Sequence, residues 1–201
     1  MTDDVTALYL DAARTFADLT TRIRPAQWTE PGLGHWDVRA LTGHTSRALV
    51  TVLNYLDQPS ATEGVTSAEG YLAGIGHQQV DPAAVAERGI QAGHALGEDP
   101  AAAVAQRVQQ VTDRLATQDL NVVVSTIVGG MRVRNYLPTR TFELVVHSFD
   151  IARAAGTTVD FDPAVLTHAA ELAARTAIVQ GQGAAFLFAV TGRPEAGFSV
   201  V

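Results

Sequence analysis

Apolar side chains recur every three or four residues along two stretches near the N-terminus, a spacing typical of helices that bury one face. In residues 4–23 the series is Val5, Leu8, Ala12, Phe16, Leu19 and Ile23. In residues 37–57 it is Leu41, Ala48, Leu49, Val52 and Leu56. Asp37 stands where an N-cap is needed, just before the second series. The pattern therefore predicts two amphipathic helices joined by a loop over residues 25–35.

Three Asp-Pro pairs, at positions 81–82, 99–100 and 162–163, predict further helix starts. Asp accepts hydrogen bonds well at the N-cap, and Pro is tolerated at the first helical position because its missing N–H has no intrahelical partner there. These pairs predict helices over about 82–96, 100–117 and 163–180. Residues 58–76 are rich in Gly, Ser and Thr and are predicted to form a long connection with room for a helical turn.

Residues 121–128 read NVVVSTIV, a β-branched run that favours a strand. Gly129 and Gly130 separate this run from MRVRNYL, so we expect a short β-hairpin. A helix is predicted within residues 139–156, with Pro138 near its first turn and Gly156 just past its end. A short apolar segment at 184–190 follows. The predicted fold class is mainly α, a helical bundle with a small β-hairpin addition and extra C-terminal helices.

Composition narrows the broad class of the protein. The length of 201 residues favours a single domain, and the hydrophobic content of 47% is ample for a core. No apolar run approaches the roughly 18 residues that a membrane helix needs. The acidic start MTDDVT does not resemble a signal peptide. We therefore expect a cytoplasmic protein that is not embedded in a membrane, as a monomer or a homodimer.

Two compositional absences restrict the chemistry. The chain has no cysteine, which excludes disulfides, thiolate metal ligands and a thiol nucleophile of its own. The net charge is −7 and the basic residues form no block, so we expect no nucleic-acid partner.

A polar stripe lies within the apolar stretch at 139–156. Glu143, His147 and Asp150 are spaced by four and three residues, which places them on one side of a helix. Glu143 and His147 can reach a common point, and an ionised Glu among apolar residues is costly unless it is paired or bound to a cation. His44 faces the core on another helix and could supply a third ligand. A His, Glu, His set suits zinc, and also nickel, iron or manganese.

Simpler interpretations of the same residues exist. Glu143 and His147 could form a hydrogen bond within the core, and His44 could bond to backbone or water. Arg140 could face the same cavity and hold a substrate carboxylate, or it could be a surface residue near the helix start. Asp150 could support a ligand histidine or pair with Arg153. No role is assigned to the other histidines, His35, His77, His94 and His168.

Two segments resemble one known family. HWDVRALTGHTSRAL at 35–49 and LPTRTFELVVHSFDIARAAG at 137–156 are similar to the two hallmark segments of the mycothiol-dependent maleylpyruvate isomerase family, part of the DinB-like superfamily. The resemblance covers a core of about residues 5–160 and implies a DinB-like four-helix bundle. It also implies one divalent metal, most simply zinc, bound by His44, Glu143 and His147. Residues 161–201 would form a helical extension within the single domain 1–201.

The resemblance further implies mycothiol as cosubstrate, since the chain has no thiol of its own. In the isomerase, the thiolate adds to a cis double bond conjugated to a carbonyl, the bond rotates, and the thiol leaves. That enzyme continues into a separate C-terminal domain, so the resemblance concerns the metal-binding domain. The expected function is a metal-dependent isomerase or thiol S-transferase acting on a small electrophilic substrate. The alternatives are a DinB-like metal-binding protein without catalysis and a metal-dependent hydrolase.

Overall fold

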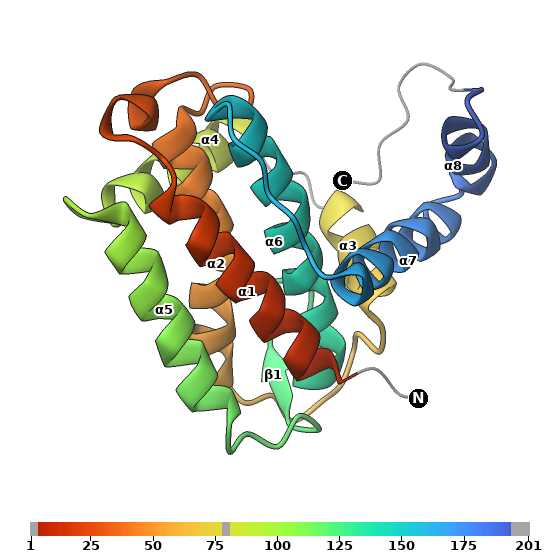
Figure 1. Cartoon of the computed structure of the whole chain (residues 1–201). Coiled ribbons are helices and arrows are strands. Elements are labelled where there is room, and N and C mark those ends of the chain that lie inside the picture. Colours follow the sequence, from red (N-terminus) through yellow and green to blue (C-terminus); the bar gives the residue numbers. More distant parts are fainter. Residues whose placement is uncertain (1–3, 78–80, 194–201) are drawn as a thin grey trace.

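The computed structural model describes residues 4–77 and 81–193, and a four-helix bundle forms its centre (Figure 1). The bundle consists of α1 (Val5–Thr21), α2 (Val38–Leu56), α5 (Pro100–Leu115) and α6 (Val133–Ala154). Helices α1 and α2 each pack against both α5 and α6. The structure therefore confirms the predicted fold class, a mainly helical DinB-like bundle with a small β-hairpin.

Aspartate caps begin most of these helices, as the sequence predicts. The Asp37 carboxylate accepts a hydrogen bond of 2.7 Å from the backbone N–H of Ala40 at the start of α2. Asp81, Asp99 and Asp162 accept equivalent bonds at the starts of α4 (Pro82–His94), α5 and α7 (Pro163–Val179). Each bond satisfies a donor that the helix itself leaves without a partner.

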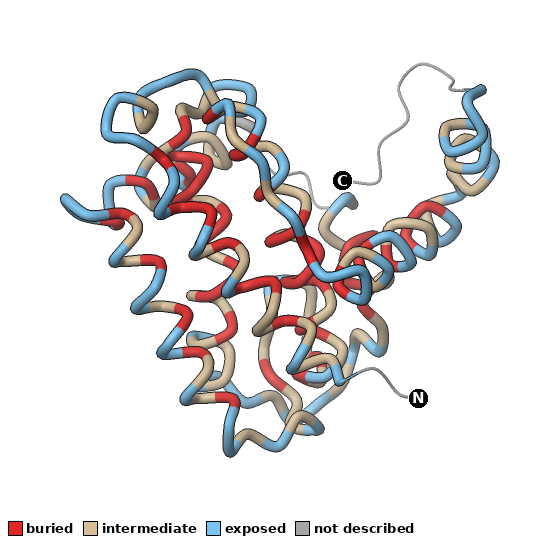
Figure 2. The backbone as a smooth tube through the Cα atoms, in the orientation of Figure 1, coloured by how far each residue is buried: buried red, intermediate tan, exposed pale blue. Residues whose placement is uncertain are grey.

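The core lies between the four bundle helices, where the buried residues in Figure 2 face one another. Phe16, Leu49, Val111 and Leu144, one from each helix of the bundle, are fully buried. The three- and four-residue spacing of apolar side chains therefore positions each helix by burying its apolar face, the main favourable term in folding. This packing sets α2 directly against α6.

The β-hairpin also changes where α6 begins. Strands β1 (Val123–Ser125) and β2 (Gly130–Arg132) pair antiparallel, with Val124 opposite Met131. The expected start of α6 near Pro138 is wrong, because the helix begins at Val133 and contains Pro138. The N–H groups of Val133 and Arg134 donate to the carbonyls of Val122 and Leu120, in the segment that leads into the hairpin. The hairpin thus supplies partners for the first turn, and the helix can start before the proline.

Two helices and a 3-10 turn cover the bundle on the side of α2 and α6. Helix α4 packs on α2, and α3 (Ala68–His77) packs on α6 and α7. A 3-10 helix, Pro25–Thr29, occupies part of the expected loop before α2. The prediction of a long connection with a helical turn over 58–76 is wrong in extent, since α3 is a ten-residue helix.

The C-terminal region adds α7 and α8 (Gly183–Val190), as expected from the Asp162-Pro163 start and the apolar segment after it. Helix α7 packs on α3 and α6, while α8 packs on α7 and extends away from the bundle (Figure 1). Residues 194–201 of the expected helical extension lie outside the described residues. Within the described ranges, no helix is both long enough and apolar enough to span a bilayer.

Candidate metal centre

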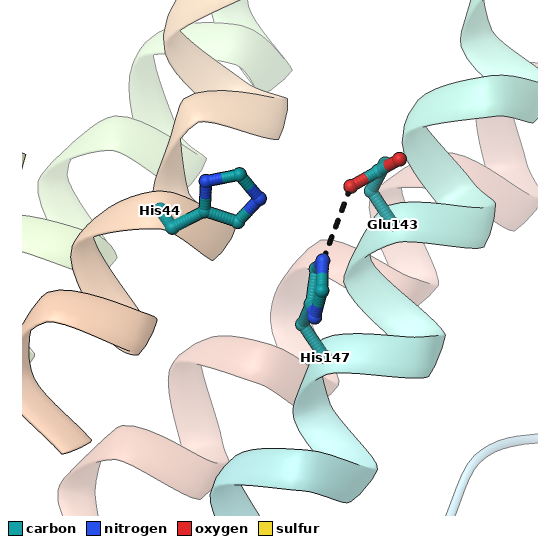
Figure 3. A group of neighbouring side chains, drawn as sticks. All are labelled: His44, Glu143 and His147. Carbon is teal, nitrogen blue, oxygen red and sulfur yellow. Dashed lines mark ion pairs between the residues drawn. The ribbon is translucent and has the colours of Figure 1, made fainter. Parts of the chain in front are cut away.

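Three predicted site residues come together between α2 and α6 (Figure 3). His44 lies on α2 between the buried residues Leu41 and Ala48, so the same periodicity that buries those two turns His44 inward. Glu143 and His147 lie one turn apart on α6 and face α2. Because α2 packs against α6, the three side chains point at a common space.

The three donor side chains lie close together. His147 Nε2 lies 3.3 Å from Glu143 Oε2. The rings of His44 and His147 are 5.0 Å apart and nearly perpendicular, at 83°. One ligand atom from each residue can be chosen so that all three lie within 4.8 Å of one another. Divalent metals make bonds of about 2.0–2.2 Å to such donors, so a single ion could bind all three after a small inward shift of the side chains.

The charges at these residues favour a cation between them. Burial, helped by the neighbouring His147, lowers the pKa of His44 to about 4, so His44 is neutral at pH 7. Burial alone would raise the pKa of Glu143, but the His147 hydrogen bond and the charge of Arg140 outweigh it and hold that pKa at about 2. Burial acts to lower the pKa of His147 too, but its hydrogen bond with Glu143 dominates and raises it. The Glu143 carboxylate is thus held ionised beside His147, where a bound cation would compensate its charge.

The donor set fits a divalent metal. One carboxylate and two imidazoles, without sulfur, match the ligands that zinc and other first-row ions accept in proteins. The side chains of Glu143 and His147 are only 22% and 16% exposed, so a carboxylate and an imidazole are held away from most solvent. No second cluster of this kind is present among residues 4–77 and 81–193.

Asp150 lies behind His147 and contacts both of its proposed partners. Its Oδ2 is 3.4 Å from His147 Nδ1, the ring nitrogen turned away from Glu143. Its Oδ1 accepts a hydrogen bond of 2.5 Å from Arg153 Nη2. Asp150 therefore contacts both His147 and Arg153, the two partners that the sequence presents as alternatives. A carboxylate in this position fixes the orientation of a ligand imidazole.

Trp36 covers the other histidine. Its indole stacks on the His44 ring, with centroids 4.5 Å apart and planes 30° from parallel. The indole Nε1–H donates a 2.8 Å hydrogen bond to the carbonyl of Ala86 on α4. Gly89 leaves room for the ring, because a Cβ there would lie 2.3 Å from Trp36 Nε1. Helix α4 thus holds the indole that positions His44.

The three donors lie in the wall of a cavity of about 520 Å³. Helices α2, α3, α4 and α6 all contribute to its lining, together with Ile127 of the hairpin loop. Glu143 supplies the one carboxylate among the described lining residues, whereas Arg47, Arg88 and Arg140 supply three guanidinium groups. The volume is in the range of small-molecule sites, so the donors face a space that can hold a ligand.

Arg140 lies inside this cavity and not on the surface. The residue is 8% exposed, and its guanidinium packs against the rings of Tyr136 and Tyr71, at 4.9 and 5.6 Å from their centroids. The interpretation as a surface arginine near the helix start is wrong, because α6 begins seven residues earlier, at Val133. The first turns of α6 therefore pass behind the cavity and carry Arg140 into its lining.

A comparison with models of known protein families identifies the relatives of this chain. Residues 9–152 match the model of the mycothiol maleylpyruvate isomerase N-terminal domain. The chain belongs to this family. The match includes all four bundle helices from Tyr9 of α1 to Ala152 of α6, and with them the whole donor set. Membership relates the chain to a mycothiol-linked, metal-binding enzyme family. Helices α7 and α8 lie beyond the matched residues.

Searches of curated proteins and of solved structures gave no significant match to the chain. The family relationship and the geometry of the site are therefore the two sources for the function proposed below.

Sequence reasoning missed three residues that shape the site. Trp36 precedes α2, and no helical spacing relates it to His44. Tyr71 comes from α3, a helix that was not expected. Tyr136 could have been found, because it stands four residues before Arg140 and so shares its face of α6. Of the remaining histidines, His35 and His94 line a separate cavity of about 230 Å³ between α2 and α4.

Proposed function

We propose that this protein is a divalent-metal-dependent enzyme that uses a small-molecule thiol, mycothiol or a close relative, to isomerise or S-transfer a small electrophilic substrate. The observation that carries the proposal is the convergence of His44, Glu143 and His147 in the wall of a cavity. A purely structural metal would be expected in a closed shell of four protein ligands. Three donors beside an open space are the arrangement of catalytic sites.

In this proposal His44, Glu143 and His147 hold the metal, with zinc the simplest choice. When bound, the metal supplies Lewis acidity, which lowers the pKa of a thiol that reaches it and favours the nucleophilic thiolate. The chain has no cysteine, so that thiol must come from a cosubstrate. The family, named for mycothiol, supports a thiol of this kind.

Other side chains of the site orient the two histidines and line the cavity. Asp150 contacts Nδ1 of His147, so that Nε2 faces Glu143 and the proposed metal position. Trp36 fixes the plane of the His44 ring. Phe142 and Val146 flank Glu143 and His147 on α6 and add apolar surface to the lining of the cavity. A water-poor site strengthens the electrostatic interactions inside it.

Hydrolysis by a metal-activated water is less well supported. Such a mechanism needs a general base near the attacking water, usually a carboxylate or a histidine that is not a ligand. Among the described residues that line the cavity, Glu143 is the one carboxylate and His44 and His147 are the histidines. All three are assigned to the metal, which leaves no base for a hydrolase.

Metal analysis and calorimetry test the proposal together. We expect about one divalent ion per chain in the wild type and in His94→Ala, and little in His147→Ala. His94 is an exposed histidine of α4 outside the large cavity, so it is the matched control. Mycothiol should bind the metal-loaded wild type and His94→Ala but not His147→Ala. Equal binding to all three proteins, or to none, contradicts the thiol mechanism.

A further inference from the structure

The end of α7 and the whole of α8 expose a group of large apolar side chains. Helix α8 lies against α7 and extends away from the bundle (Figure 1), and none of its eight residues is buried. The described residues leave eight large apolar side chains exposed, and five of them fall within positions 178–190: Ile178, Val179, Leu187, Phe188 and Val190. Single exposed apolar residues are ordinary, but a group of this kind marks an interaction surface.

Three of these side chains form a stripe across the junction between the two helices. Ile178 of α7 reaches the start of α8, where its Cγ1 would lie 3.4 Å from a Cβ placed on Gly183. Leu187 and Val190 follow Gly183 by four and seven residues, a spacing that places all three on one face of α8. Ile178, Leu187 and Val190, here named the α7–α8 stripe, are 67%, 59% and 63% exposed.

The segment that carries the stripe has no charged residue. Residues 176–192 contain no Asp, Glu, Lys, Arg or His, whereas the chain as a whole has a net charge of −7. Copies of an acidic protein repel one another, and the repulsion is smallest where neither surface in contact carries acidic side chains. The segment also offers no charge pattern for a different protein to complement, and homodimer interfaces are the more apolar class. The charge distribution therefore favours a second copy of this chain as the partner.

A lipid surface fits the same segment less well. Helices that lie in a membrane interface carry Lys or Arg on their polar face, and anionic lipids attract basic segments. Helix α8 has eight residues and no basic side chain, and the net charge of the chain opposes binding to an anionic surface.

We propose that the α7–α8 stripe is the interface of a homodimer, in which this segment of each copy packs on the same segment of the other about a two-fold axis. One patch then serves both copies, so it must be complementary to itself, as an uncharged apolar surface is. The five exposed side chains leave on the order of 500 Å² of apolar surface in water per copy. Two copies would bury roughly 1,000 Å², the lower limit for a specific interface, so we expect a reversible dimer. The stripe does not line the large cavity, and the dimer is independent of the proposed reaction.

The mass of the full chain in solution tests the interface. By light scattering after size-exclusion chromatography, we expect the wild type at high micromolar concentration to have close to twice the 21.2 kDa of one chain. Leu187→Glu should raise the dissociation constant of the dimer by about tenfold or more, because the two-fold axis places the new carboxylate in the interface twice. Leu33→Glu is the matched control, since Leu33 is a large apolar side chain, 41% exposed, outside the stripe. This variant should dimerise as the wild type does.

Two results overturn the inference: a wild type that stays monomeric, or a dimer that Leu187→Glu leaves intact. Circular dichroism checks that each variant keeps its helix content, and Val190→Glu replaces Leu187→Glu if that variant does not fold. Flotation with vesicles of anionic and of neutral lipid tests the other occupant. Vesicle binding by a monomeric wild type, lost in Leu187→Glu, would assign the stripe to a membrane surface and contradict the dimer.

Discussion

Trp36 and His44 stack face to face at a centroid distance of 4.5 Å, although seven residues lie between them in the sequence and only His44 is within α2. The contact depends on α4, since the indole donates to the Ala86 carbonyl and fills the space left by Gly89. The imidazole of His44, a proposed metal ligand, is thus positioned by a ring whose own position is set by α4. This relationship makes a position with no donor atom important for the metal centre.

Gly89→Ala should weaken metal binding although Gly89 contacts no ligand. The new methyl group would lie 2.3–2.7 Å from three atoms of the indole, so the ring must move and release both the Ala86 carbonyl and His44. We expect a loss of roughly tenfold in zinc affinity, the low end for residues that orient metal ligands. Competition with a chelating dye measures it. Gly64→Ala is the matched control, because a Cβ there meets nothing within 4 Å.

Much of the bundle could be predicted because capping and periodicity are local. Asp37 and the Asp-Pro pairs determine helix starts within a residue or two, since they bond to the next backbone N–H groups. Helix α3 could not be predicted in this way. It contains Gly70, Gly74 and Gly76, which disfavour isolated helices, and it is stabilised by packing against α6 and α7. At Gly74 the closeness is direct, since a Cβ would lie 2.5 Å from Val128.

The placement of the site residues likewise depends partly on local spacing and partly on contacts between distant segments of the chain. Glu143 and His147 could be paired from a spacing of four on one helix. His44 could be added because the α2 periodicity turns it inward, and the family resemblance pointed to the same three residues. The environment of Arg140 could not be predicted, because it depends on Tyr71 from α3 and on the early start of α6. Those contacts arise from tertiary packing, which no local pattern encodes.

Asp150→Asn should lower metal affinity by roughly 10–100-fold, the usual effect of removing a carboxylate that orients a ligand histidine. The amide keeps the size of the side chain but loses the charge that faces His147 Nδ1 at 3.4 Å. Arg153→Met separates the two roles of Asp150, since it removes the Arg153 pair and leaves the carboxylate in place. Zinc titration of Arg153→Met should match the wild type. An Asp150→Asn variant with wild-type affinity would reduce Asp150 to a helix-surface partner of Arg153.

The metal-free protein should lose stability between pH 6.5 and pH 4 because of His44. Burial lowers its pKa from 6.5 to about 4 in the folded state. The stability from neutral His44 is therefore complete above pH 6.5 and is lost as the pH falls towards 4. The loss should be on the order of 2–3 kcal/mol. His147 does not mask it, since its pKa is raised and its own effect lies above pH 6.5.

Urea unfolding at several pH values measures this loss in the wild type and in His44→Phe. Phenylalanine keeps a ring against Trp36 but does not titrate. The difference in unfolding free energy between the two proteins should change across pH 6.5–4 and be constant above it. A pH-independent difference would mean that His44 is not buried as a neutral group.

Gly43→Ala should separate α4 from α2 and so test whether α4 is needed for the centre. A Cβ at Gly43 would lie 2.1 Å from the backbone N of Gly93 and 2.4 Å from the carbonyl carbon of Ala92, and backbone cannot yield as a side chain can. Alanine favours a helix over glycine by about 1 kcal/mol, but a forced shift of this kind typically costs 1–3 kcal/mol or more, so the net effect should be destabilising.

The consequence for the metal centre follows from the position of Gly43, one residue before His44. If α4 moves, Trp36 loses its partner at Ala86 and no longer holds the His44 ring. Gly43→Ala should therefore lower both the urea midpoint and zinc affinity, whereas Gly89→Ala should affect zinc affinity more than stability, because the tip of a side chain moves more readily than backbone. Intact zinc binding in a destabilised Gly43→Ala protein would show that α2 and α6 alone position the three donors.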